Sequence, residues 1–229
     1  MRNILKINAE FWTEDRSLTA LLVYLLIDVF FLLPFMHTEA GEIINAVFFS
    51  LILISGVFAV ASETHFRIMI ILLAMTTFVI QWLHLVDGSV YFQIANVISS
   101  IVFLSTLTFV VILHIFKGGQ VSFHRIQGAI AVYILVGLIW ANAYHIIYLF
   151  YQNAFIFPDF QKAGEPFYNR FMYFSYVTLT TLGYGDIIPI NAAAKSLVMV
   201  EGLTGQLFPA IMITRLVSLE IESRKNRMV

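Results

Sequence analysis

The sequence predicts an all-α membrane protein with six transmembrane helices and one shorter re-entrant helix. Two observations lead to this fold class. First, 60% of the 229 residues are hydrophobic, only 12% are charged and the mean hydropathy is +0.87, whereas an ordinary soluble domain carries about twice that charged fraction. Second, the apolar residues form long runs, and a helix needs roughly 20 such residues to cross a hydrocarbon core of about 30 Å.

Each predicted span is an apolar run bounded by a polar link. The runs lie at 17–36, 43–62, 66–85, 90–116, 127–151 and 193–218. Lysine and arginine accumulate on the cytoplasmic side of a membrane protein. With a cytoplasmic N-terminus, ten of the 13 basic residues fall on that side, and only Lys162, Arg170 and Lys195 fall outside. We therefore expect a multi-pass protein of the plasma (cell inner) membrane with both termini in the cytoplasm.

Residues 152–192 interrupt the pattern of spans. They begin with the polar, turn-rich piece QNAFIFPDFQKAGEP, which the amphipathic stretch FYNRFMYFSYVTLT (167–180) follows. Fourteen helical residues reach only about 21 Å, which is too short to cross the membrane. Next comes TLGYGD (181–186), and irregular backbone at membrane depth must be buried in protein or line a water-filled path. We therefore predict a loop that enters and leaves the membrane on one side.

The stretch TLGYGD resembles the selectivity filter of potassium channels, with leucine where that family has valine. The resemblance implies a K⁺ site whose ligands are backbone carbonyl groups and one threonine hydroxyl. Carbonyl groups point the same way only where left- and right-handed backbone alternate, and glycine adopts the left-handed form freely. We expect Gly183 and Gly185 to supply these conformations. The implied K⁺ ligands are Thr181, Leu182, Gly183 and Tyr184.

The same resemblance implies which residues support the filter. Tyr184 would point outward toward two aromatic residues of the short helix, Tyr173 and Phe174. Asp186 would lie at the outer mouth and attract cations, and Thr180 would support the filter from below. One loop supplies one quarter of each ring of carbonyl groups, so the resemblance implies a homotetramer around the pore axis.

The last span carries the candidate gating residues. Gly205 follows Gly183 by 22 residues, which matches the family position at which the inner helix bends, and Gly202 and Pro209 lie about one turn before and after it. A gating hinge and close helix packing through small residues both fit these positions. Glu201 lies about 12 Å from the outer end of the span, too deep to remain without a partner. It either braces the short helix or filter from behind or lines the conduction path.

The fourth span, 90–116, lacks the arginines of a voltage sensor. It contains no Lys or Arg, and the first basic residue after it is Lys117. Steep voltage gating requires several charges inside the span, so we expect no gating of that kind. The polar residues Gln93, Asn96 and Ser100 share one face of this span, which predicts interhelical packing.

Asp28 is a buried acid of uncertain role in the first span. Counting along the helices puts it at the depth of Asn96 and Ser100, so we expect hydrogen bonds to them, with His84 as a weaker partner. Proton sensing by Asp28 or the histidines is the alternative. The remaining histidines have no metal-site spacing and are expected to be packed or interfacial; they include His65, His114, His124 and His145.

The predicted organisation places a four-helix peripheral domain before a pore domain. The segments are a cytoplasmic segment (1–16), the peripheral domain (17–116), a cytoplasmic linker (117–126), the pore domain (127–218) and a basic cytoplasmic tail (219–229). The resemblance implies a passive, six-span, single-loop potassium channel of a prokaryote. A non-selective cation channel and a non-conducting regulatory channel subunit are the alternatives. We expect no catalytic residue, cofactor, nucleic acid or small-molecule substrate, and the expected partners are identical subunits and membrane lipid.

Overall fold

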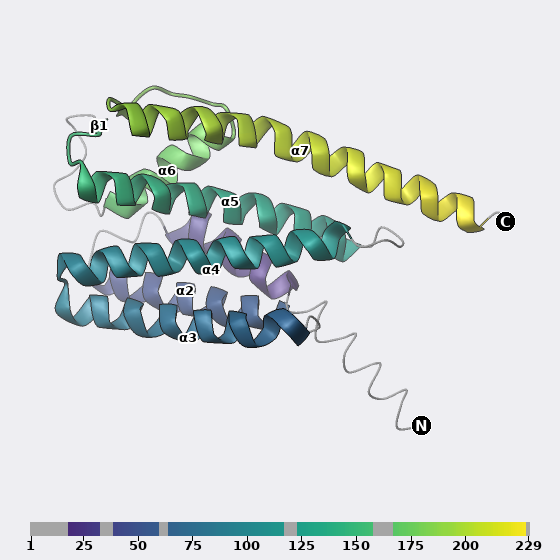
Figure 1. The fold of residues 1–229 in the computed structure, drawn as a ribbon, viewed down its shortest axis with the longest axis horizontal. Coiled ribbons are helices and arrows are strands. Elements are labelled where there is room, and N and C mark those ends of the chain that lie inside the picture. Colours follow the sequence, from purple (N-terminus) through teal and green to yellow (C-terminus); the bar gives the residue numbers. More distant parts are fainter. Residues whose placement is uncertain (1–17, 33–38, 60–63, 117–122, 158–166, 228–229) are drawn as a thin grey trace.

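A computed structural model of the chain describes residues 18–32, 39–59, 64–116, 123–157 and 167–227. Most of these residues are helical (Figure 1). The predicted cytoplasmic segment 1–16, residues 117–122 of the predicted linker and the outer Lys162 lie outside the described residues.

The helices follow one another with short connections. Residues 18–27 form a helix that continues as the π-helical η1 (Asp28–Leu32). The later helices are α2 (Glu39–Ala59), α3 (Thr64–Asp87), α4 (Val90–Phe116), α5 (Phe123–Phe150), α6 (Phe167–Leu179) and α7 (Ala192–Arg227). Two short strands, β1 (Phe155–Ile156) and β2 (Ile188–Pro189), pair antiparallel, with Phe155 opposite Pro189 and Ile156 opposite Ile188.

The helical, membrane-type architecture that the sequence predicts is confirmed. Of the described residues, four helices are long and apolar enough to cross a membrane; they are Arg67–Asp87, Val90–Phe116, Phe123–Phe150 and Ala192–Ile221. The shorter apolar helices Leu18–Phe30 and Ile43–Ala59 occupy the positions of the first two predicted spans. α7 runs on to Arg227 rather than ending at 218, because its last turns are rich in Glu, Lys and Arg, which favour helix.

Local signals explain where α3 ends and where α7 begins. α3 ends at Asp87, and the next residue, Gly88, has a left-handed φ of +61°. Its N–H donates to the His84 carbonyl at 2.8 Å, as in a glycine C-cap. α7 begins after Asn191, whose Oδ1 accepts a hydrogen bond from the Ala194 N–H at 2.7 Å. Asparagine is a preferred N-cap because its side chain satisfies an N–H group that the helix leaves unpaired.

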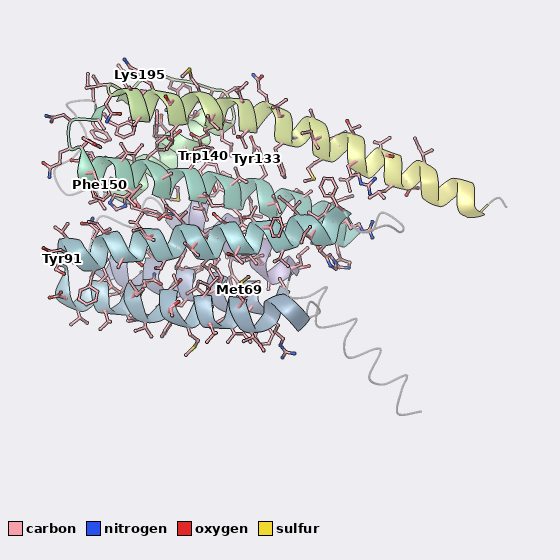
Figure 2. The ribbon with its side chains drawn as sticks, viewed as in Figure 1. Met69, Tyr91, Tyr133, Trp140, Phe150 and Lys195 are labelled. Atoms are coloured by element: carbon pink, nitrogen blue, oxygen red, sulfur yellow. The ribbon has the colours of Figure 1, made fainter. Side chains whose placement is uncertain are left out.

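The long helices lie roughly side by side, and α6 crosses between α5 and α7 (Figure 1). α2 and α3 pack together, α4 joins α3 to α5, and α6 contacts both α5 and α7. Large apolar side chains are exposed on the outer faces of α3 and α7 (Figure 2), such as Ile68 at 69% and Leu203 at 60%. Such faces suit contact with lipid or with a partner chain.

Candidate functional site

The end of α6 passes directly into residues 181–186. The N–H groups of Leu182 and Gly183 both donate to the Val177 carbonyl, at 2.9 and 3.2 Å, so the chain leaves the helix at Thr181. The hydroxyl of Thr180 donates to the Tyr176 carbonyl at 2.6 Å. These bonds satisfy the last carbonyl groups of α6 and fix the direction in which the following stretch departs.

Left-handed backbone recurs at every second residue of the stretch. The φ angle is +61° at Thr181, +56° at Gly183 and +75° at Gly185. The two glycines thus have the conformation that the sequence predicts, and Thr181 adds a third such position, which is uncommon for a β-branched residue. Among the described residues, the structure shows no hydrogen bond to the carbonyl oxygens of residues 181–185. These carbonyl groups remain available to a ligand.

A hydrogen bond from α6 holds the far end of the stretch. The Tyr173 hydroxyl donates to Asp186 Oδ2 at 2.8 Å, and Asp186 Oδ1 accepts from the Ile187 N–H at 3.0 Å. The Asp186 carboxylate thus connects the end of the stretch both to α6 and to the backbone of Ile187.

Phe174 does not meet Tyr184 as predicted. It is 6% exposed, and its ring packs edge-on against Tyr144 and Phe155, with centroid distances of 5.0 and 5.7 Å. Consecutive residues of a helix point about 100° apart, so Tyr173 and Phe174 cannot both face the same stretch. Phe174 anchors α6 to α5 and β1, while Tyr184 is 68% exposed.

Glu201 is fully buried between three helices. From α7 it accepts hydrogen bonds from the Tyr144 hydroxyl of α5 and from the Ser175 hydroxyl of α6, the latter at 2.5 Å. Ser175 Oγ also lies 2.7 Å from the Gly137 carbonyl. Glu201 therefore lies behind α6, away from residues 181–185. Sequence reasoning missed its two partners, because a serine and a tyrosine on other helices give no local signal.

Gly205 packs against the carboxyl end of α6. A Cβ added there would collide with the Leu179 carbonyl oxygen, whereas one added at Gly202 would meet nothing within 4 Å. The same Leu179 carbonyl accepts a hydrogen bond of 3.1 Å from the Tyr133 hydroxyl of α5. This geometry matches the packing alternative for Gly205. A gating hinge at Gly205, with a bend assisted by Pro209, stays a prediction. Pro209 lies inside α7 as expected.

Tyr133 and Arg215 are further contact residues that the sequence did not single out. Tyr133 of α5, labelled in Figure 2, stacks on Phe208 of α7 at a centroid distance of 5.9 Å. Arg215 of α7 donates to the Phe116 carbonyl at the last residue of α4, at 3.1 Å. A cation suits this place because the carbonyl groups at the end of a helix carry partial negative charge.

The predicted hydrogen bonds of Asp28 are wrong for the residues that the structure describes. Asp28 is 2% exposed, and its Oδ1 has no hydrogen-bond partner among them. It interacts electrostatically with Tyr168 and Tyr176 of α6. Residue counting fixes the depth of a side chain in a bundle but not the direction in which it points, so equal depth did not make Asn96 or Ser100 a partner of Asp28.

The polar face of α4 instead lines a cavity. Gln93, Asn96 and Ser100 contribute to its wall together with His84 and His145, and Gln93 Nε2 lies 3.3 Å from His145 Nε2. Over the described part of the chain, no group of three or more His, Asp or Glu side chains is placed to hold a metal ion. The side chain of His65 lies outside the described residues.

Comparison with known proteins gives a family match in the second half of the chain. Residues 132–222, which include α6, the stretch 181–186 and Glu201, match the family described as ion channel. The chain is also similar to the two-pore potassium channel 4 of Arabidopsis thaliana, with 39% identity over 79 residues. The alignment covers 34% of this chain and 26% of that relative, so the chain matches about a quarter of the relative's length. These matches point to transport rather than to catalysis.

Proposed function

We propose that the chain is one subunit of a potassium-selective channel that conducts K⁺ passively across the inner membrane of a prokaryotic cell. The observation that carries the proposal is the alternation of left-handed backbone at Thr181, Gly183 and Gly185. In such a stretch, the carbonyl oxygens can replace the hydration shell of the ion. The match of residues 132–222 to the ion channel family supports the same function.

The proposed channel is a homotetramer, as the resemblance to potassium channels implies. One chain supplies only one carbonyl group to each ring around an ion, so four copies are needed. In the single chain, Leu182 is 59% exposed and Tyr184 is 68% exposed. Neighbouring subunits would cover these side chains.

The proposed topology has six spans, with both chain ends in the cytoplasm. The helix 18–32 and α2 would be the first two spans, and α6 with residues 181–186 would form the re-entrant loop from the outer side. α4 would be a packing helix rather than a voltage sensor, because no Lys or Arg occurs between Val90 and Phe116 and voltage sensing requires charge that moves through the field.

Ion flux from liposomes tests the proposal. The purified protein is incorporated into potassium-loaded vesicles, and K⁺ efflux is compared with Na⁺ efflux from matched vesicles. We expect K⁺ flux to exceed Na⁺ flux and to be blocked by barium. Equal flux of the two ions would indicate a non-selective cation channel. No flux of either ion would indicate a non-conducting regulatory subunit.

A pair of glycine variants connects the flux to the proposed filter. Gly183→Ala forces a side chain onto a residue with a φ of +56°, and Gly88→Ala does the same at a φ of +61° in the α3–α4 turn. Both variants have the same kind of backbone strain, and neither added Cβ meets a neighbour within 4 Å. Loss of selective flux in Gly183→Ala but not in Gly88→Ala supports the assignment. Equal flux in the two variants contradicts it.

A further inference from the structure

Gln206 is an exposed glutamine in the middle of the long helix α7. The part of α7 that is long and apolar enough to cross a membrane is Ala192–Ile221, so Gln206 lies about 21 Å from either end of it. Its side chain forms no hydrogen bond with another described residue. An amide without a hydrogen-bond partner is costly in hydrocarbon, so lipid is an unfavourable environment for Gln206.

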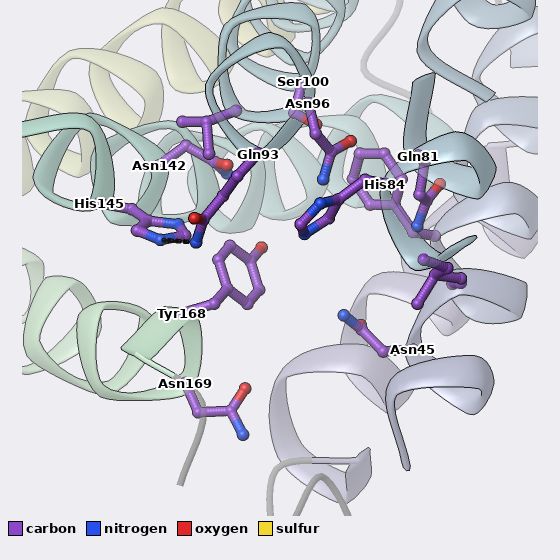
Figure 3. A pocket seen from close by; sticks show the side chains of 14 residues that line it. Asn45, Gln81, His84, Gln93, Asn96, Ser100, Asn142, His145, Tyr168 and Asn169 are labelled. Atoms are coloured by element: carbon purple, nitrogen blue, oxygen red, sulfur yellow. Dashed lines mark hydrogen bonds between the residues drawn. The ribbon is translucent and has the colours of Figure 1, made fainter. Parts of the chain in front are cut away.

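The other described asparagine and glutamine side chains of the helices are buried or half-buried. Gln127 accepts a hydrogen bond from the Thr19 hydroxyl at 3.0 Å. Most of the others gather around the cavity that α4 lines (Figure 3); they are Asn45, Gln81, Gln93, Asn96, Asn142 and Asn169. Within the described helices, Gln206 is therefore the exposed amide, and it requires water or a partner that the single chain does not supply.

A row of small or polar residues continues from Gln206 along α7. Residues four apart lie one above the other on a helix, and Ala210, Thr214 and Ser218 follow Gln206 at this spacing, all of them exposed. The exposed positions beside the row carry large apolar residues, such as Leu207 at 56% and Ile213 at 63%. Polar residues within a membrane usually face the protein interior or a water-filled path. The row therefore suits water, and the apolar positions beside it suit lipid or neighbouring subunits.

The packing of Gly205 brings Gln206 to the level of the inner end of the proposed filter. Gly205, which directly precedes Gln206, packs against the Leu179 carbonyl group. Thr181, two residues after Leu179, begins the stretch of left-handed backbone. In the proposed topology, the row runs from this level toward the cytoplasmic end of α7. It thus spans the depth that an ion crosses between the cytoplasm and the filter.

We propose that Gln206 lines the water-filled inner entrance of the filter and determines how readily K⁺ enters it. This inference rests on the proposed channel function. In the tetramer, four Gln206 amides surround the path of the ion just before Thr181. Their oxygens replace part of the water that K⁺ loses before it reaches the carbonyl groups of residues 181–184. Because these amides are neutral, they bind the ion weakly enough for it to move on, as conduction requires.

Gln206→Cys tests whether the position faces water. The chain contains no cysteine, so the new thiol is unique. The variant is first assembled in potassium-loaded liposomes and then treated on both sides with a membrane-impermeant methanethiosulfonate that attaches a trimethylammonium group. Such reagents require the thiolate, which forms in water. We expect the thiol to react and K⁺ flux to fall by more than about tenfold relative to the untreated variant, because the attached cations repel K⁺.

Met75→Cys is the matched control. Met75 lies in the middle of α3 and is 59% exposed, on an outer face that suits lipid. Its thiol should remain unmodified, and K⁺ flux should be unchanged by the reagent. Because the reagent is added after assembly, any change in flux reports the modified channel rather than a failure to fold.

A pair of charged variants tests the effect on the ion. At low salt, K⁺ flux through Gln206→Glu should exceed that through Gln206→Lys by at least about tenfold, since a ring of acids attracts cations and a ring of amines repels them. Added choline chloride should reduce this difference by screening. The control pair, Gln152→Glu and Gln152→Lys, makes the same change of charge on the exposed turn after α5, and its two members should conduct alike.

The outcomes separate this inference from the proposed function. An unreactive thiol in Gln206→Cys, a reaction that leaves K⁺ flux unchanged, or equal flux through Gln206→Glu and Gln206→Lys would each overturn the inference. In those cases, selective flux through the unchanged protein would still support the proposed channel. Absence of selective flux through the unchanged protein would overturn the channel function and the role of Gln206 with it.

Discussion

Replacement of Gly205 by alanine tests whether this residue is a packing position or a hinge. The new Cβ would collide with the Leu179 carbonyl oxygen and lie 2.7 Å from the carbonyl carbon. The obstacle is backbone at the end of α6, so α6 and the stretch it carries must shift. Overpacking costs about 1–3 kcal/mol, while alanine in place of glycine in a helix gains up to about 1 kcal/mol. We expect a net loss of up to about 2 kcal/mol per subunit, together with reduced preference for K⁺.

Gly202→Ala is the matched control on the same helix. No atom lies within 4 Å of its added Cβ, so only the gain in helix propensity of up to about 1 kcal/mol remains. The assay combines the thermal midpoint of the purified protein in detergent with the ratio of K⁺ to Na⁺ flux from liposomes. Packing predicts a lower midpoint and a lower flux ratio for Gly205→Ala alone. If Gly205→Ala matches Gly202→Ala in both quantities and only conducts more slowly, the packing argument is refuted and the hinge is favoured.

Three further predictions concern the polar contacts of α6 and α7. Glu201→Leu leaves the buried Tyr144 hydroxyl without its acceptor, while Ser175 keeps the Gly137 carbonyl; the variant should cost about 1–3 kcal/mol. Glu201→Gln should cost less, and equal thermal midpoints for the two variants would contradict this. Tyr173→Phe removes the hydrogen bond to Asp186 and should lower the free energy of unfolding by about 1 kcal/mol. It should also lower the ratio of K⁺ to Na⁺ flux, and an unchanged ratio would disprove this role of the hydrogen bond. Arg215→Gln weakens the contact with the end of α4 by about 1 kcal/mol and should lower the thermal midpoint without changing selectivity; a changed flux ratio would show that this contact acts on the filter.

The positions of the helices could be predicted because the signals for them are local. The fourth predicted span coincides with α4 at both ends, since Gly88 and Ser89 mark its start and the apolar run ends at Phe116. α6 lies within one residue of the predicted short helix. The left-handed conformations of Gly183 and Gly185 were expected from the resemblance of TLGYGD to a filter, and glycine adopts them at little cost.

The contacts between helices could not be predicted, since a helix that is apolar on every side gives no sign of its rotation. α5 is such a helix, and its Tyr144 could not be matched to Glu201 from the sequence. The hydrogen bonds expected from Asp28 to Asn96 and Ser100 failed for the same reason. The cavity could not be predicted either, because its wall draws residues from five helices that only the packing brings together.

The contacts of α6 explain how one chain can hold its part of a filter in place. Polar groups tie this helix to its surroundings along its length: Tyr173 to Asp186, Ser175 to Glu201 of α7, and Tyr176 to the Ile134 carbonyl of α5 at 2.7 Å. Its end is held by Tyr133, which donates to the Leu179 carbonyl. Because these ties come from two helices and from the stretch itself, α6 cannot shift without breaking several of them at once. α6 thus links its first turn, which lies at the wall of the cavity, to residues 181–185 at its other end.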